Sequence, residues 1–141
     1  MARRGKIVVL DSSVAVKWFS KEPRSDEAIN LMDSYVEGSI DLSVSELLFY
    51  EVANALRYKP DYDVERLRNA ISQLFRLNLK VTPISEELLT RACETAYDAE
   101  VTLYDALPAA LAERQKTICI TADEETQYEK LHRRGYPIEL L

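Results

Sequence analysis

Short apolar runs alternate along the chain with longer segments of helical periodicity. The runs are rich in β-branched residues, as in strands buried on both faces of a parallel sheet. The longer segments repeat apolar residues every three or four positions, which is typical of helices packed on one face. The pattern predicts strands near residues 6–11, 41–45, 79–84, 116–123 and 137–141.

The segments between these strands are predicted to be helical. Ser25 or Asp26 can cap a helix that runs to Gly38, and Ser85 is an expected N-cap further on. The other helices are expected near residues 14–20, 46–59, 63–78, 103–115 and 124–135. Strands alternating with helices favour an α/β fold, a three-layer α/β/α sandwich whose central parallel sheet has about five strands in the order 3-2-1-4-5.

Length and composition fit one soluble domain over residues 1–141. The chain is 47% hydrophobic and 30% charged, with only 3 Gly and 5 Pro. Its basic start, "MARRGK", is followed by an apolar run that ends at Asp11, too short for a signal peptide. No uncharged stretch reaches the roughly 18 residues of a membrane span. We therefore expect a cytoplasmic protein without a membrane segment.

Two aspartates end apolar strands. Asp11 closes "KIVVLD" and Asp123 closes "KTICITAD". Parallel strands direct their carboxyl ends to one edge of the sheet, and with the order 3-2-1-4-5 the first and fourth strands are neighbours about 4.8 Å apart. The two carboxylates should therefore face one crevice.

Two further acids occupy apolar surroundings. Glu51 shares a helical stripe with Leu48, Val52 and Ala55, which faces the sheet. Asp105 opens a helix whose next seven residues, "ALPAALA", carry no charge, so that helix should be largely buried. A buried acid needs a partner, and both side chains are candidates for the same site.

Four carboxylates gathered in one place with no cation between them would be strongly disfavoured or partly protonated, and a divalent ion resolves this. Unit charges 4 Å apart repel by about 4 kcal/mol near a protein surface. The chain has a single histidine, His132, and its two cysteines, Cys93 and Cys119, have no Cys-x-x-Cys spacing, so thiolate or imidazole sites are not expected. All-oxygen ligation selects Mg²⁺ or Mn²⁺, and such ions favour phosphodiester hydrolysis.

The net charge of −6 argues against nucleic-acid binding through a broad basic surface. Acids clustered around divalent cations are an exception, because the ions cancel their charge. Lys17, Lys21 and Arg57 follow the candidate acids closely and are predicted contacts to a substrate backbone.

"VVLDSS", "YEVANAL", "LYDALPAALA" and "ITAD", in this order, resemble the acidic signature of PIN-domain nucleases. The size and layout are similar to VapC-type toxins of toxin–antitoxin pairs. The resemblance implies an Mg²⁺- or Mn²⁺-dependent ribonuclease acting on RNA. Its metal-binding and catalytic quartet would be Asp11, Glu51, Asp105 and Asp123, supported by Ser12 and Thr121. It also implies a homodimer and a small VapB-like antitoxin as partner.

Pro108 departs from a regular helix, because it lacks a backbone donor. If Asp105 lies near the N-cap, Pro108 falls in the first turn, where the missing donor costs little. If Pro108 lies later in the helix, a position of Asp105 near the N-cap does not follow from the sequence.

Simpler roles compete with these assignments. Asp11, Asp123 and Asp105 could act only as helix caps, and Glu51 could be an exposed helix residue. Ordinary structural or solvated roles are expected for the remaining conspicuous side chains, which are Glu46, Glu124, Glu125, His132, the packed thiols, and Trp18 and Phe19 as core or dimer contacts.

Four other functions are possible for an α/β chain of this kind. A receiver-like phosphoacceptor would need an acidic pair after the first strand and a lysine after a later one, and "LDSS" and "ITAD" lack them. A haloacid-dehalogenase-type phosphatase would need an Asp where Ser13 stands, and a dinucleotide or P-loop protein a glycine-rich loop. An inactive PIN-like binding module would be expected to lose acids, and all four are present.

Overall fold

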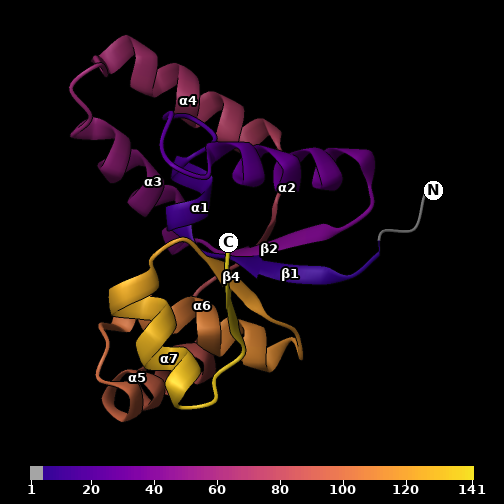
Figure 1. Cartoon of the computed structure of the whole chain (residues 1–141), viewed down its shortest axis with the longest axis vertical. Helices are drawn as coiled ribbons and strands as arrows, with labels where there is room; N and C mark the ends of the chain where they lie inside the picture. Colours follow the sequence, from indigo (N-terminus) through magenta and orange to yellow (C-terminus); the bar gives the residue numbers. More distant parts are fainter. Residues whose placement is uncertain (1–4) are drawn as a thin grey trace.

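The computed structural model of the chain describes residues 5–141, so the basic start at residues 1–4 lies outside the described residues. Its centre is a parallel five-stranded sheet in the order β3-β2-β1-β4-β5, as predicted (Figure 1). The strands are β1 (Ile7–Leu10), β2 (Asp41–Ser45), β3 (Lys80–Thr82), β4 (Cys119–Thr121) and β5 (Ile138–Leu140).

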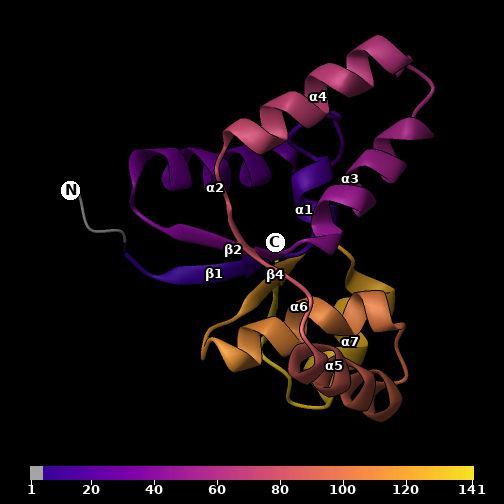
Figure 2. The same cartoon turned by 180° about the vertical axis from the view of Figure 1, so that it is seen from behind.

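Helices cover both faces of this sheet, which confirms the three-layer sandwich (Figures 1 and 2). One layer holds α1 (Ser12–Val16), α2 (Ser25–Glu37), α3 (Leu47–Arg57) and α4 (Val64–Arg76). The other holds α5 (Glu86–Ala99), α6 (Leu103–Arg114), a π-helical turn η1 (Glu124–Tyr128) and α7 (Glu129–Arg133).

The first strand, β1, is apolar throughout because both of its faces are covered by helices. Val8 and Leu10 join the core cluster beneath α1–α4, whereas Val9 joins the cluster beneath α5–α7. Successive strand residues point to opposite faces, so a strand covered on both sides needs apolar residues at every position. The apolar run ends at Asp11, which follows the last residue of β1 and lies at the carboxyl-terminal edge of the sheet.

Helix ends were predicted with mixed success. Ser85 caps α5 by accepting the Leu88 amide, and Gly38 ends α2 at φ +87°. The predicted cap of α2 is wrong, because the residue before it is Arg24 at φ +67° and the Ser25 hydroxyl accepts instead from the Glu22 amide, 2.9 Å away. The expected helix over 14–20 begins earlier, at Ser12, and is only five residues long.

Pro108 does not lie in the first turn of α6. Thr102 is the N-cap, so Asp105 is the third and Pro108 the sixth helical residue. Pro108 removes the N–H that would reach the Tyr104 carbonyl, yet α6 continues to Arg114. The proline is buried within the α6 segment that packs on the sheet, and Asp105 keeps its place at the start of the helix.

The remaining structural expectations are partly met. Trp18 is a core contact, since its indole donates to the Ala28 carbonyl at 2.8 Å and packs on the core together with Phe19. Both thiols are free, but only Cys119 is buried; Cys93 is exposed, so its expected packing is wrong. Within residues 5–141 every helix is too short or too polar to cross a membrane.

Candidate active site

Asp11 lies at the carboxyl end of β1 and is 5% exposed. It caps α1: its Oδ2 accepts from the Ser13 amide at 3.1 Å and from the Ser13 hydroxyl at 2.5 Å. Its Oδ1 accepts from Gln127 Nε2 at 3.1 Å. These neutral donors compensate for lost hydration without neutralising the charge, so Asp11 stays able to attract a cation.

The neighbouring strand β4 brings a second acid to the same edge. Thr121 is fully buried; its hydroxyl lies 2.8 Å from Gln127 Oε1 and 3.3 Å from Asp11 Oδ2, and accepts from the Asp123 amide at 3.1 Å. Asp123 caps η1 through the amide and hydroxyl of Thr126, at 3.2 and 2.5 Å. Asp11 and Asp123 therefore do cap helices, and they do so at adjacent strand ends.

Glu51 approaches from α3, whose stripe faces the sheet as expected. Its neighbours Leu48 and Val52 are 2% and 1% exposed. Partial burial raises the pKa of Glu51 to about 7, helped by the negative charges of Asp11 and Asp105. A hydrogen bond from the Ser12 side chain opposes this rise. This interaction places the Ser12 side chain beside Glu51.

Asp105 completes the group from the first turn of α6. Partial burial, with the charges of Asp11 and Asp123, raises its pKa to about 6. The Thr102 hydroxyl and the charge of Lys130 lower it. Elements from four separate stretches of the chain thus bring four carboxylates within range of one another's charges.

The donor set of this site suits a hard divalent cation. Across residues 5–141, no three His, Cys, Asp or Glu side chains form a ready-made coordination cage. Mg²⁺ does not require one, since it keeps several waters and is bound by one or two carboxylates together with substrate phosphates. Burial, and after it the charges of neighbouring carboxylates, raises the pKa of Glu51 and Asp105, and a divalent cation bound here would favour their ionised forms.

The three predicted substrate contacts differ in availability. Lys17 lies 3.3 Å from Glu22 Oε1, donates to the Pro23 carbonyl at 2.8 Å, and has an 11% exposed side chain. Lys21 and Arg57 are exposed. Lys17 is thus occupied. Lys21 and Arg57 are accessible to a ligand, although the Arg57 guanidinium lies over the Tyr58 ring, 5.3 Å from its centroid.

Glu46 and His132 have the ordinary roles that were expected of them. Glu46 accepts the Ile84 amide at 2.8 Å and thereby holds the loop after β3. His132 is exposed and stacks on the Tyr128 ring, with centroids 4.9 Å apart.

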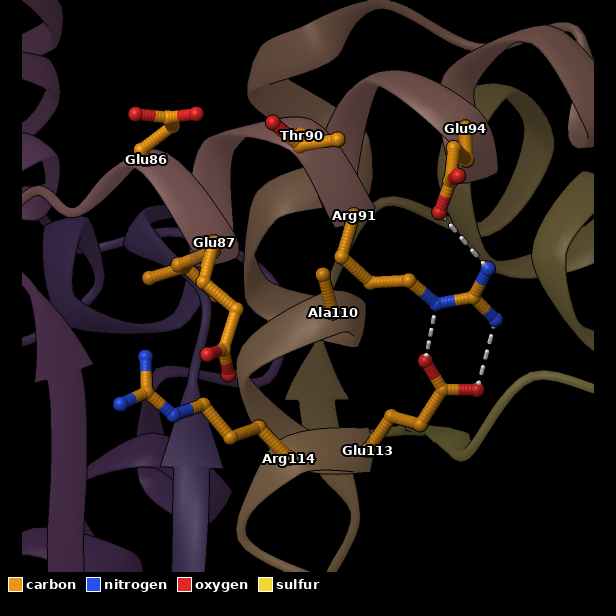
Figure 3. A pocket seen from close by; sticks show the side chains of 9 residues that line it. Glu86, Glu87, Thr90, Arg91, Glu94, Ala110, Glu113 and Arg114 are labelled. Carbon is orange, nitrogen blue, oxygen red and sulfur yellow. Dashed lines mark hydrogen bonds and ion pairs between the residues drawn. The ribbon is translucent and has the colours of Figure 1, made fainter.

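A surface hollow of about 720 Å³ lies away from the acids, between α5 and α6 (Figure 3). Its Arg91 is held by both carboxylate oxygens of Glu113, at 2.6 and 3.0 Å, and by Glu94 at 3.4 Å. Glu86 and Glu87 add further negative charge to the lining. This hollow therefore offers a polyanion little attraction.

Sequence reasoning missed two side chains that contact Asp11, namely Ser13 and Gln127. Gln127 carried a usable signal, because it lies four residues before the buried Leu131 and so falls on the inner face of the last helical segment. The same reasoning had identified Glu51. Ser13 carried no such signal, since its role depends on the turn that Asp11 caps.

Comparison with solved structures shows the same fold across most of the chain. VapC20 of Mycobacterium tuberculosis, described as a toxin that cleaves the sarcin–ricin loop, has a TM-score of 0.69 at 13% identity, covering 92% of this chain and 95% of that one. VapBC2 of Rickettsia felis, bound to a promoter DNA fragment, has 0.68 at 15%, covering 96% and 98%. DNA-bound VapBC of Salmonella typhimurium has 0.67 at 16%, covering 99% and 98%.

No match was found among curated proteins. The family model of the PIN domain, in contrast, matches residues 8–131, which include all four acids. The chain therefore belongs to the PIN domain family.

Proposed function

We propose that the protein is an Mg²⁺- or Mn²⁺-dependent endoribonuclease and the toxin of a VapBC-type pair. The observation that carries this is the convergence of Asp11, Glu51, Asp105 and Asp123 at the carboxyl edge of a PIN-domain sheet, where two of them have raised pKa values. Membership of the PIN family leaves the receiver-like alternative without support. An inactive binding module is distinguished by the assay below.

Each acid has a separate task in this proposal. Asp11 and Asp105 would hold the ion directly, and Asp123 and Glu51 would hold it or its water ligands. When bound, the ion would lower the pKa of an attacking water and stabilise the charge on the attacking and departing oxygens. The positive charge would also favour the ionised forms of Glu51 and Asp105. Ser13 and Gln127 keep the Asp11 carboxylate oriented.

RNA is the proposed substrate because the similar fold of VapC20 belongs to a toxin described as cleaving the sarcin–ricin loop. Among the predicted backbone contacts we retain Lys21 and Arg57, whose side chains are exposed, over Lys17. A surface of net negative charge implies few phosphate contacts, so binding should depend only weakly on salt.

The assay incubates purified protein with labelled RNA in Mg²⁺, Mn²⁺ or EDTA, beside Asp11→Asn purified in parallel. Cleavage by the wild type with either ion, abolished by EDTA and absent from the variant, is the expected result. Equal cleavage in every lane would identify a contaminant and contradict the proposal. The substrates include total RNA and a sarcin–ricin-loop oligonucleotide, since a toxin can be selective for one structured RNA.

A small VapB-like antitoxin is the proposed partner. Because the proposed substrate is RNA, the proposed site of action is the cytoplasm. Support comes from the solved VapBC assemblies of the same fold. A short reading frame directly preceding the gene would encode the antitoxin. Co-purification of its product with this chain, and loss of RNA cleavage in the complex, are the expected results.

A second copy of the chain is the other proposed partner. Five large apolar side chains, each at least 43% exposed, surround two adjoining hollows of about 360 and 540 Å³. We name this the apolar face; it consists of Tyr50, Phe75, Val81, Ile84 and Tyr104. Clustered exposure of this kind is typical of an interaction surface.

Ile84→Lys, within the apolar face, is expected to weaken dimerisation at least about tenfold, because it places a charge where apolar surface is to be buried. Val64→Lys is the matched control, since Val64 is equally exposed, at 71% against 68%, but lies outside this face. Sedimentation equilibrium measures both. A wild type that stays at 16.1 kDa at all concentrations, or equal effects of both substitutions, would contradict the dimer.

A further inference from the structure

Gln127 is an uncharged polar side chain that is 1% exposed, and all its polar atoms are paired. Its Nε2 donates to Asp11 Oδ1 at 3.1 Å and to the Asp105 carbonyl at 3.1 Å. Its Oε1 lies 2.8 Å from the Thr121 hydroxyl. One side chain thus connects the ends of β1 and β4 with the first turn of α6.

The orientation of this amide follows from its partners. Asp11 Oδ1 and the Asp105 carbonyl can only accept hydrogen bonds, so both must face the NH₂ group. The Thr121 hydroxyl has one proton and donates it to Gln127 Oε1, while its oxygen accepts from the Asp123 amide. Rotating the amide by 180° would set its oxygen against two acceptors, so a single arrangement is satisfied.

The backbone at Gln127 is adapted to this task. η1 is a π-helical turn, closed by the Tyr128 amide donating to the Asp123 carbonyl at 2.9 Å. A π turn adds one residue, which rotates the following side chains by about 100° relative to an α-helix. Asp123 can therefore cap the turn while Gln127, four residues later, points inward. Such turns occur frequently at functional sites.

We infer that Gln127 is a positioning residue, which fixes the Asp11 carboxylate relative to Asp105 so that the two can share one divalent cation. This inference rests on the proposed function. A neutral amide suits the task, because it satisfies the buried carboxylate and leaves its full negative charge for the ion. A lysine or arginine in the same place would neutralise Asp11 and compete with the cation.

Gln127→Met tests this, because methionine has a similar length and shape but no hydrogen-bonding amide. We expect the affinity for Mn²⁺, measured from the free-ion EPR signal, to fall about 10- to 100-fold, as for other residues that orient metal ligands. The turnover of RNA should fall while its KM is unchanged. Gln115→Met is the matched control, since Gln115 is a partly buried glutamine at the far end of α6.

A measurement on the wild type keeps the test independent of how the variant folds. In ¹⁵N-labelled protein, substoichiometric Mn²⁺ should broaden the side-chain amide signals of Gln127 and leave those of Gln115 and the exposed Gln73 sharp. Unbroadened Gln127 signals in protein that binds Mn²⁺, or wild-type affinity in a folded Gln127→Met, would overturn the inference alone. A wild type that binds no Mn²⁺ would overturn the proposed function and this inference together.

Discussion

Asp105→Asn is expected to lower metal-dependent RNA cleavage by about 100-fold or more while the chain stays folded. Asparagine has the same shape and also suits the first turn of α6, where the Asp105 amide donates to the Thr102 hydroxyl at 3.1 Å. The substitution removes one of two proposed direct ligands. A loss of about 3 kcal/mol of transition-state stabilisation corresponds to roughly 100-fold in rate.

Cleavage rates at saturating Mn²⁺ and circular dichroism measure the two parts of this prediction. Asp33→Asn is the control, because Asp33 is an exposed aspartate on α2, away from the acidic group. A folded Asp105→Asn with more than a tenth of the wild-type rate would contradict the assignment of Asp105. A loss of the same size in Asp33→Asn would show that the assay reports something other than the site.

Glu51→Gln is expected to stabilise the metal-free protein at pH 8 and to have little effect at pH 4. The pKa of Glu51 is raised from 4.5 in its ordinary state to about 7 in the folded chain. Stability from this group is therefore fully present below pH 4.5, falls as the pH rises through 7, and is lost above it. Glutamine has no proton to lose, so the variant escapes that decline.

The gain at pH 8 should be on the order of 1–2 kcal/mol, after allowance for solvent screening of a partly exposed group. Urea unfolding in EDTA at both pH values measures it, with the exposed Glu139→Gln as control. Adding Mn²⁺ should reverse the order of stability, because bound cation stabilises the wild type more. A Glu51→Gln protein that is less stable than the wild type in EDTA at pH 8 would contradict the raised pKa of Glu51.

The strands and helices of the fold were predictable because the patterns that specify them extend over a few neighbouring residues. Val8, Val9 and Leu10 must all be apolar in a strand covered on both faces, and the residue that ends such a run marks the edge of the sheet. Asp11 and Asp123 could be placed together because parallel strands share one carboxyl edge. Glu51 could be added because an acid on an apolar stripe needs a partner.

Other features depend on tertiary contacts that no local pattern encodes. The α2 helix begins after Arg24 in a left-handed conformation, which the pattern of caps did not anticipate. The spacing from Leu131 places Gln127 on the inner face of its segment, but its contact with Asp11 is made from a π turn, which helical periodicity does not predict. In the sequence Ser13 resembles an ordinary solvated serine. In the structure its hydroxyl donates to Asp11 Oδ2 and accepts from the Ala122 amide, 2.9 Å away.

A crystal soaked in Mn²⁺ would show whether four carboxylates from separate parts of the chain share one divalent cation. Anomalous scattering at the manganese edge locates the ion without reference to the protein density. We expect a peak within ligand distance of Asp11 or Asp105, with Glu51 and Asp123 around it. Manganese bound only elsewhere, or absent from this edge of the sheet at millimolar concentration, would contradict it.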